Sequence, residues 1–363
     1  MASIPNLNTL GGGRRGHRLR GGRGTTPTHE DATADSVERG RDQVVQQTDH
    51  DASSSRMSAV ALGYLDDPYA RTFFGHDTEI PKRYPIINRG TYVRTKAIDR
   101  LVKQFLDVRP TQKKQIVSLG AGSDTRFFRL VDESSASNLH LVYHELDFEA
   151  NVNRKRTTLR QSAELSRLLK SGGDRGLTYH LHALDLRDLA VKSPPEIPSL
   201  DPQLPTLLIS ECCLCYLPHE TAAAVLDYFS MHIPGSMALV LYEPIRPFDA
   251  FGKTMVTNLA SRGIHLQTLK RYSTLEAQQG RLRLAGLSDG QAARDVLQLY
   301  DDDDWMAPEE RERIEKLEWL DEVEEWQLLA SHYCVAWGWR GEAFGEAWAS
   351  RGGSSSIRNI QMI

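Results

Sequence analysis

A run of β-forming residues that ends in a glycine turn constrains the fold of this chain more than any other stretch. Residues 115–119 read Gln-Ile-Val-Ser-Leu and lead into Gly-Ala-Gly-Ser-Asp-Thr-Arg at 120–126. The first segment is typical of a strand that is buried on both faces, as in parallel sheets. Glycines at 120 and 122 permit positive φ and let a ligand approach the bare backbone. The stretch therefore predicts either a ligand-binding turn of an α/β sheet or an ordinary strand-to-helix turn.

After this turn, strand-like segments alternate regularly with helical segments. We predict further strands at residues 140–147, 177–183, 207–214, 238–244 and 331–337, most of them separated by helices. Such alternation favours a doubly wound, mainly parallel sheet with right-handed connections. The alternation stops between about 248 and 313, where the sequence is helical and mixed in charge. We therefore predict an α/β fold with a helical insertion before the last strand.

The two ends of the chain lack the pattern of a packed domain. Residues 1–50 include two Arg/Gly tracts and show no apolar period, so we expect a disordered Arg/Gly-rich tail. Binding of RNA by these tracts is the alternative to a plain solvated tail. Residues 341–363 read as a flexible tail. These boundaries predict one ordered domain over residues 51–340.

The composition is that of an ordinary globular protein. Of the 363 residues, 40% are hydrophobic and 25% are charged, with a formal net charge of −4. This charge gives no general attraction to nucleic acid, and no apolar run approaches the roughly 20 residues that span a bilayer. The N-terminus also lacks the hydrophobic core of a secretory signal. We expect a monomeric cytoplasmic protein, with access to the nucleus left open, that binds neither nucleic acid nor membranes.

Four cysteines are present, and three of them crowd together at Cys212, Cys213 and Cys215. They lack the paired spacings of a metal site, so we predict no bound metal. Neighbours in one strand point to opposite faces and do not bridge easily. We therefore expect these cysteines to be small core residues in a reducing compartment.

Polar residues gather at the predicted carboxyl ends of the strands, where ligands of open α/β sheets bind. They are the Gly120 turn, Asp147, Asp185 and Glu211. Three carboxylates disfavour a phosphate group and suit a cationic ligand with hydroxyls, such as S-adenosylmethionine. Asp147 would accept from the ribose hydroxyls, and Asp185 with the Leu186 backbone would face the adenine. Each carboxylate alone could be a helix cap or a solvated residue, so the inference rests on their coincidence.

A nicotinamide-dependent dehydrogenase is the chief competitor for such a turn. Its fingerprint, G-x-G-x-x-G, uses the third glycine for close packing of the helix beside a pyrophosphate. Here Thr125 occupies the sixth position of the pattern. This departure favours an enzyme that binds S-adenosylmethionine, that is, a methyltransferase.

A long helix is predicted from Asn88, its N-cap, through about residue 107. Ile98 and Phe105 belong to its buried side. Arg94 lies in the first turns of this helix, which precedes the strand at residues 115–119. From there its side chain can reach the carboxyl edge of the sheet. Tyr216 follows the predicted fourth strand closely enough to reach the same place, and a buried core tyrosine is the alternative.

Five segments carry a family resemblance in the same order along the chain. They are Asn-Arg-Gly-Thr-Tyr-Val-Arg at 88–94, Ser-Leu-Gly-Ala-Gly-Ser-Asp-Thr at 118–125, Gln-Leu-Pro-Thr-Leu-Leu-Ile-Ser-Glu-Cys at 203–212, Trp-Leu-Asp-Glu at 319–322 and His-Tyr-Cys at 332–334. From about residue 51 to 339 the chain resembles the leucine carboxyl methyltransferase family. The resemblance implies a class I S-adenosylmethionine-dependent methyltransferase fold with a helical lid. It also implies methylation of the C-terminal leucine carboxylate of the protein phosphatase 2A catalytic subunit.

By the same resemblance, the cofactor contacts fall on Arg56, Arg94, Gly120, Asp147, Asp185, Leu186 and Glu211. Arg56 stands where the family usually has a lysine, which keeps the charge and changes its geometry. Four of these residues, Gly120, Asp147, Asp185 and Glu211, coincide with the cluster at the strand ends.

A terminal carboxylate has a pKa of about 3.5, so it is already ionised at neutral pH and the reaction needs no general base. We expect Arg94 and Tyr216 to be the catalytic residues, with Arg94 holding the carboxylate and Tyr216 lending a hydroxyl. Four cations of the predicted insertion form either a wall for the acceptor's tail or a solvated face: Lys270, Arg271, Arg281 and Arg283.

Two other functions stay open at this point. A related carboxyl methyltransferase of the tRNA wybutosine pathway would carry a repeat-built propeller, and no period of about 50 residues occurs here. A catalytically silent protein that keeps the cofactor as a stabiliser, or that regulates phosphatase assembly, would bind S-adenosylmethionine without transferring its methyl group.

Overall fold

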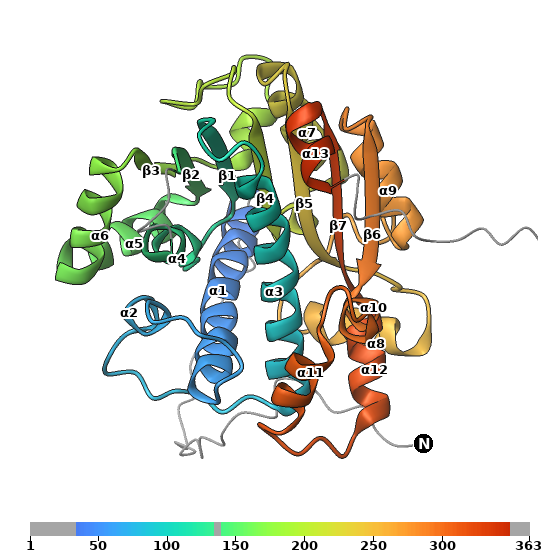
Figure 1. The fold of residues 1–363 in the computed structure, drawn as a ribbon. Helices are drawn as coiled ribbons and strands as arrows, with labels where there is room; N and C mark the ends of the chain where they lie inside the picture. The colour runs from blue at the N-terminus through green and yellow to red at the C-terminus, as the bar shows by residue number, and fades with distance from the viewer. Residues whose placement is uncertain (1–33, 134–138, 349–363) are drawn as a thin grey trace, which may run out of the picture.

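The computed structural model describes residues 34–133 and 139–348, and its centre is a seven-stranded sheet with helices on both faces (Figure 1). The strands lie in the order β3-β2-β1-β4-β5-β7-β6. β1 to β5 are parallel, and β7 runs antiparallel to its neighbours β5 and β6. This confirms the predicted doubly wound, mainly parallel sheet. The strands are β1 Lys114–Leu119, β2 Leu141–Asp147, β3 Leu177–Ala183, β4 Thr206–Glu211, β5 Met237–Pro244, β6 Gly290–Asp295 and β7 Tyr333–Arg340.

Alternating side chains of the central strands build two cores. In β1, Ile116 packs into the core on one face and Val117 into the core on the other. Every residue of β1 is buried, the polar Lys114, Gln115 and Ser118 as well as the apolar ones, as expected of a strand covered on both faces. The first face is covered by α3 Pro85–Asp107, α4 Arg126–Glu133, α6 Ala163–Asp174 and α13 Glu342–Trp348. The second is covered by α7 His219–His232, α9 Leu275–Leu284 and the 3-10 helix η2 Leu186–Ala190.

The remaining elements connect the strands and surround their carboxyl ends. They are α1 Ala34–Ala61, α2 Ala70–Phe74, α5 Glu149–Gln161, the 3-10 helix η3 Leu214–Tyr216, α8 Ala250–Ala260, α10 Val296–Asp301, α11 Pro308–Glu315 and α12 Val323–Ser331. The predicted N-cap of α3 is wrong, because the helix begins at Pro85 and Asn88 lies within it. Proline is well suited to the first helical turn, where its missing N–H has no partner to lose.

Helix α1 shows that the predicted boundary at residue 50 is wrong. It begins at Ala34 and runs beside α3 (Figure 1). Its first and middle turns are anchored by charged side chains: Asp42 Oδ2 lies 2.6 Å from Arg187 Nη2, and Asp49 Oδ1 accepts from the Ser123 N–H at 2.7 Å. A helix anchored by polar contacts needs no strong apolar stripe, so its sequence shows none. The rest of the predicted disordered tail, residues 1–33, lies outside the described residues.

Helix α13 likewise corrects the flexible tail predicted from residue 341. The Phe344 ring stacks on Phe105 of α3 with centroids 4.4 Å apart, and Trp348 Nε1 donates to the Leu101 carbonyl at 3.3 Å. Phe344 and Trp348 are both buried. A helix of seven residues is too short for its periodicity to stand out in the sequence. Residues 349–363 of the predicted tail lie outside the described part of the chain.

The region predicted as a helical insertion, residues 248–313, contains part of the sheet. β6 lies there, at the edge, and among the described strands it pairs only with β7. Its sequence, Gly-Gln-Ala-Ala-Arg-Asp, has no β-branched or aromatic residue. The strand is stabilised by backbone hydrogen bonds to β7, which leave no signature in its own side chains.

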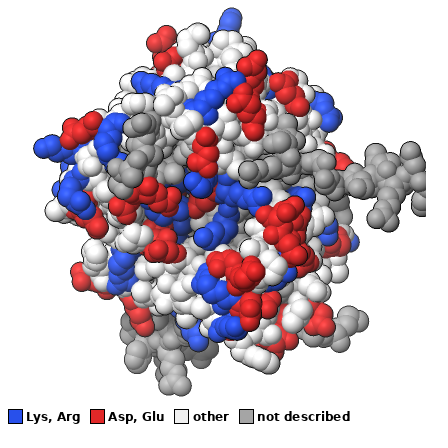
Figure 2. Space-filling view, in the orientation of Figure 1, with Lys and Arg blue, Asp and Glu red and all other residues white. Residues whose placement is uncertain are grey.

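The surface around this sheet is mixed in charge. Figure 2 shows acidic and basic side chains intermingled on the face that it presents. Among the described residues, no helix combines the length and the apolar character that a membrane crossing requires.

Candidate functional site

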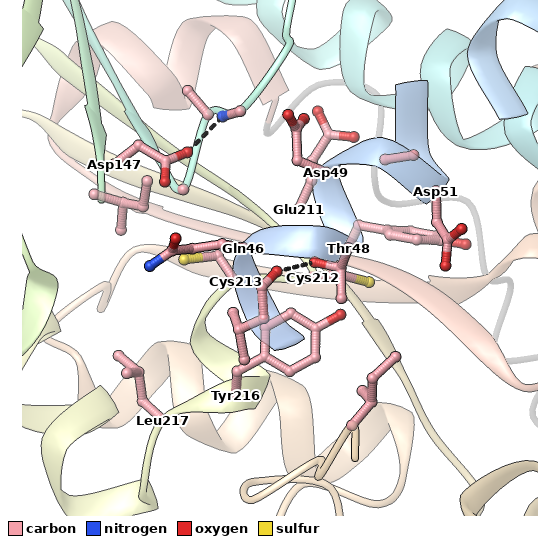
Figure 3. Close-up of a pocket in the computed structure, with 18 of the residues that line it drawn as sticks. Gln46, Thr48, Asp49, Asp51, Asp147, Glu211, Cys212, Cys213, Tyr216 and Leu217 are labelled. Carbon is pink, nitrogen blue, oxygen red and sulfur yellow. Dashed lines mark hydrogen bonds between the residues drawn. The ribbon is translucent and has the colours of Figure 1, made fainter. Parts of the chain in front are cut away.

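A cavity of about 1120 Å³ lies at the carboxyl edge of the parallel strands. Its floor is the glycine turn after β1 together with the ends of β2 and β4, and its walls include α1, α3, η3 and α12. Figure 3 shows Asp147 and Glu211 of the strand ends, Thr48 and Asp49 of α1, and Tyr216 of η3. The structure brings all eight predicted site residues to this cavity: Arg56, Arg94, Gly120, Asp147, Asp185, Leu186, Glu211 and Tyr216.

The turn after β1 requires its two glycines. Gly120 has φ +62° and Gly122 has φ +49°, a region that other residues rarely adopt. A Cβ built at Gly120 would lie only 2.6 Å from Sγ of Cys213. The N–H of Gly122 donates to Asp147 Oδ2 at 2.6 Å, which ties the end of β1 to the end of β2 (Figure 3).

Asp147 is a buried carboxylate that the chain itself holds in place. Its Oδ1 accepts from the Phe148 N–H at 2.7 Å and from Asn151 Nδ2 at 2.9 Å. Burial raises the pKa of Asp147, although these hydrogen bonds and the one from Gly122 oppose the rise. Its two oxygens offer about four lone pairs, so it retains capacity for a further donor.

Asp185 directly precedes η2 and is its N-cap. Its Oδ1 accepts from the Arg187 N–H at 2.9 Å. Both carboxylate oxygens also lie 3.0 Å from Arg187 Nε. Arg187 reaches on to Asp42 of α1, so this carboxylate takes part in fixing the helix over the cavity. Leu186 and Val191 give the same end of the cavity an apolar lining.

Glu211 lies between two arginines at the end of β4. Arg126 Nη2 donates to Glu211 Oε1 at 2.9 Å, and Arg94 Nε lies 3.5 Å from Oε2. Arg126 is fully buried and also pairs with Asp99 at 2.8 Å and Asp124 at 2.6 Å. Burial alone would lower the pKa of Arg94, but the Glu211 carboxylate reverses that effect and the pKa is raised. Arg94 is therefore a permanent cation at the cavity floor.

Arg56 reaches the cavity from α1, and its charge is already partly compensated. Its Nη1 donates to Asp67 Oδ2 at 2.9 Å, and the same oxygen accepts from the Thr125 hydroxyl at 2.6 Å. Tyr216 lies at the end of η3, opposite α1 (Figure 3). Burial raises the pKa of Tyr216 well above its ordinary value, so its hydroxyl stays protonated and can donate.

Helix α1 supplies cavity residues that the sequence reading missed. Asp42 and Asp49 line the cavity with Arg56, and Gln46 and Thr48 stand in the same wall (Figure 3). Positions 42, 49 and 56 are seven residues apart, which places them on one face of a helix. This spacing of charged residues is the signal in the sequence, but the segment lacks an apolar period and is therefore predicted to be disordered.

The inserted region contributes different residues from those predicted. Of the described residues that line the cavity, none is Lys270, Arg271, Arg281 or Arg283. Arg281 is buried in an ion pair with Glu243 at 2.8 Å, so it cannot form a wall for a ligand. The loop after α8 instead brings Arg262 and Gln267 to the cavity.

The cysteine cluster agrees with the prediction only in part, because Cys215 is a buried core residue but Cys212 and Cys213 are only half-buried. β4 ends at Glu211, so Cys212, Cys213 and Cys215 lie in the turn after the strand. Cys212 has φ +47°, an uncommon conformation for a residue other than glycine, and both Cys212 and Cys213 line the cavity. All are free thiols. Among the described residues, no group of His, Cys, Asp and Glu has the arrangement of a metal site.

The sequence of this chain is similar to those of known proteins over the whole of this site. The family described as Leucine carboxyl methyltransferase matches residues 44–230. Leucine carboxyl methyltransferase 1 of Aspergillus fumigatus is 52% identical, over 93% of this chain and 94% of that protein. The protein of the same name from Emericella nidulans is 50% identical, over 97% and 98%. That from Schizosaccharomyces pombe is 40% identical, over 80% and 93%. The matched segment contains the glycine turn, the strand-end carboxylates and Arg94, and the chain belongs to the leucine carboxyl methyltransferase family.

Proposed function

We propose that this protein transfers a methyl group from S-adenosylmethionine to the C-terminal leucine carboxylate of the protein phosphatase 2A catalytic subunit. Family membership supports carboxyl methylation of leucine. The observation that carries the finer proposal is the position of Arg94 between the glycine turn and an apolar part of the cavity. Its side chain is 17% exposed, so the cation can face an acceptor carboxylate in the cavity as well as Glu211.

The residues of the cavity floor fit the cofactor. Asp147 has acceptor capacity for the ribose hydroxyls, and the Gly120 turn leaves the backbone open to close approach. Asp185 and Leu186 would face the adenine, while Arg56, Arg94 and Glu211 would surround the charged methionine end. S-adenosylmethionine, when bound, supplies an electrophilic methyl group on a positively charged sulfur.

No residue of the cavity has to remove a proton from the acceptor. The terminal carboxylate, with a pKa of about 3.5, is ionised at neutral pH. Arg94 pairs with it and fixes its orientation, and the hydroxyl of Tyr216 donates to the same group. Because the pKa of Tyr216 is raised, the hydroxyl acts as a donor rather than as a base. Positioning at near-attack distance, about 3 Å, is the main task of the site.

Helix α1 excludes water from the reacting groups. It contributes Val45, Thr48 and Ala52 to the wall of the cavity, in addition to its charged residues. An anion and a cation neutralise each other as the methyl group is transferred, so a dry site favours the reaction. We place this reaction in the cytoplasm, with a monomeric enzyme.

The direct test is a transfer assay with tritiated S-adenosylmethionine. The phosphatase 2A catalytic subunit is compared with a version that lacks its last leucine. We expect label on the first and none on the second. Equal label on both proteins would reject the C-terminal leucine as the acceptor.

A second assay separates the enzyme from a silent binding protein. Thermal unfolding is measured with and without S-adenosylmethionine, alongside the transfer assay. We expect both a higher melting temperature and methyl transfer. Stabilisation without transfer to any C-terminal leucine would identify a protein that keeps the cofactor as a regulator.

A further inference from the structure

Beyond Arg94 the cavity continues into an apolar part, which we call the Gly90 recess. Its lining consists of Ile86, Ile87 and Gly90 of α3 with Trp326 and Leu329 of α12. Positions 86, 90 and 94 are four residues apart, so they follow one another along one face of α3. The recess therefore lies about one helical turn, roughly 5.4 Å, from a group that Arg94 binds.

Gly90 keeps this space open. Glycine inside a helix is destabilising relative to alanine, and Gly90 is not among the glycines with positive φ. A Cβ built at Gly90 would lie 3.8 Å from Cζ3 of Trp326, an ordinary contact, with no other atom closer. Neither the backbone nor a close neighbour requires glycine here. The property that glycine provides is the free volume beside Trp326.

Trp326 forms a firm wall opposite Gly90. Its side chain is buried and packs edge-on against Tyr300, with centroids 5.4 Å apart. The guanidinium of Arg89 lies 5.6 Å from the centroid of the same indole. A side chain held by an aromatic ring and a cation does not retreat easily, so the recess has a set size.

We infer that the Gly90 recess receives the side chain of the acceptor's C-terminal residue while Arg94 faces its carboxylate. This inference rests on the proposed function and adds that the size of residue 90 determines which terminal side chains are accepted. A carboxylate beside a cation, with an apolar recess one turn away, fits a terminal aliphatic amino acid. A hydrophobic pocket typically discriminates a single methylene by about 10- to 200-fold.

Gly90→Ala tests this assignment without removing any contact. The acceptors are phosphatase 2A catalytic subunits that end in leucine, valine or alanine, and kcat/KM is measured for each. We expect the value for the leucine acceptor to fall about 10-fold or more. The value for the alanine acceptor should fall less, so that the preference moves toward small side chains. The KM for S-adenosylmethionine should not change, and the melting temperature should not fall.

Gly280→Ala is the matched control. It also replaces a helical glycine, in α9, where a Cβ would meet no atom within 4 Å, and it lies outside the cavity lining. We expect it to keep the wild-type order of acceptors. Leu329→Ala provides the opposite change, because it enlarges the recess and should raise the relative rate with subunits that end in methionine or phenylalanine.

The outcomes separate the two proposals. If the wild-type protein labels none of the acceptors, the proposed function is wrong and the recess assignment falls with it. If the wild-type protein labels the leucine acceptor but Gly90→Ala and Leu329→Ala keep its order of preference, the recess assignment alone is overturned. A shift toward small acceptors in Gly90→Ala, absent in Gly280→Ala, supports it.

Discussion

The floor and the α1 wall of the cavity are held in place by different forces. The floor consists of strands buried on both faces and of an ion network around Arg126, whose side chain is 1% exposed. The first turns of α1 are held by polar pairs that are part-buried or exposed. The side chains of Asp51 and Arg262, for example, are 43% and 34% exposed, whereas Arg56, Met57 and Ala59 in its last turns are buried. Breaking a buried pair leaves an uncompensated charge, whereas an exposed pair contributes little and is screened by salt.

This difference assigns separate tasks to the two regions. A rigid floor keeps the strand-end carboxylates at fixed positions, which suits the binding of a cofactor of constant shape. We expect the first turns of α1, which are held by part-buried and exposed polar pairs, to open more easily than the floor, which suits the entry and release of that cofactor. Variants in the floor should therefore have large effects, and variants in the wall small ones.

The largest effect is expected for Arg126→Leu in the floor. Glu211 and Asp124 would lose a buried partner, so the free energy of unfolding should fall by about 3–5 kcal/mol. Denaturant unfolding measures it. Arg109→Ala, which removes an exposed arginine from its pair with Glu346, is the control and should leave the unfolding curve unchanged. A small loss in Arg126→Leu would show that the floor is no firmer than the wall.

Arg94→Ala should abolish most activity and preserve the fold. We expect turnover to fall by about 100-fold or more, because the acceptor carboxylate loses the cation that orients it. Steady-state kinetics and the melting temperature are measured together. Lys96→Ala, at an exposed position on the same helix outside the cavity, should keep normal turnover. Normal turnover in Arg94→Ala would remove Arg94 from the reaction.

The stability of the protein should also depend on pH, through histidines on the neighbouring strands β2 and β3. His144 Nδ1 lies 3.0 Å from His182 Nε2, and burial lowers the pKa of His144 to about 3 and of His182 to about 4. The unfolded chain, with an ordinary value near 6.5, then binds more protons below that pH. Stability should fall as the pH drops below 6.5, with a slope of at most about 1.4 kcal/mol per pH unit for each histidine.

Denaturant unfolding at pH 7.5, 6.5 and 5.5 measures this slope. His182→Asn should reduce it, because one titrating ring is removed from the cluster that it forms with His144 and His180, whose pKa is also lowered by burial. His76→Asn, at an exposed position, should leave it unchanged. An equal slope in the wild-type protein and in His182→Asn would contradict the assignment.

In the wall, Asp49→Asn should weaken cofactor binding moderately. Asp49 accepts from the Ser123 N–H at 2.7 Å and from its hydroxyl at 2.8 Å, so it fastens α1 to the glycine turn. Loss of about 1 kcal/mol corresponds to a dissociation constant for S-adenosylmethionine that is about fivefold higher. Isothermal titration calorimetry measures the constant. Tighter binding in the variant would mean that the carboxylate obstructs the cofactor.

The smallest effect is expected for Asp51→Asn, which removes the exposed pair with Arg262. The cofactor dissociation constant should rise about twofold at low salt, and the difference should disappear at about 0.5 M salt. The same calorimetry at two salt concentrations decides the point. A large effect that persists at high salt would place Asp51 with the floor residues.

The floor was predictable from the sequence because burial on both faces leaves apolar runs, and because parallel strands end at one edge. The glycine turn, Asp147, Asp185 and Glu211 follow from these two rules. The wall was not predictable in this way, because the first turns of α1 are anchored by single charged side chains and not by a stripe of apolar residues. The partners of Arg126 were equally hidden. Asp124 is a neighbour in the turn before α4, but Asp99 of α3 and Glu211 of β4 reach Arg126 only in the tertiary fold.

The contact between α3 and α13 has a consequence for how the protein is made. The hydrogen bond from Trp348 to Leu101 joins residues 247 positions apart, and Phe344 stacks on the same helix. The helix that carries Arg94 is synthesised early, yet it acquires its last packing partner only after residue 348 has left the ribosome. Contacts of such long sequence range form late in folding. A chain interrupted before α13 would hold the residues of the site without the support that fixes their helix.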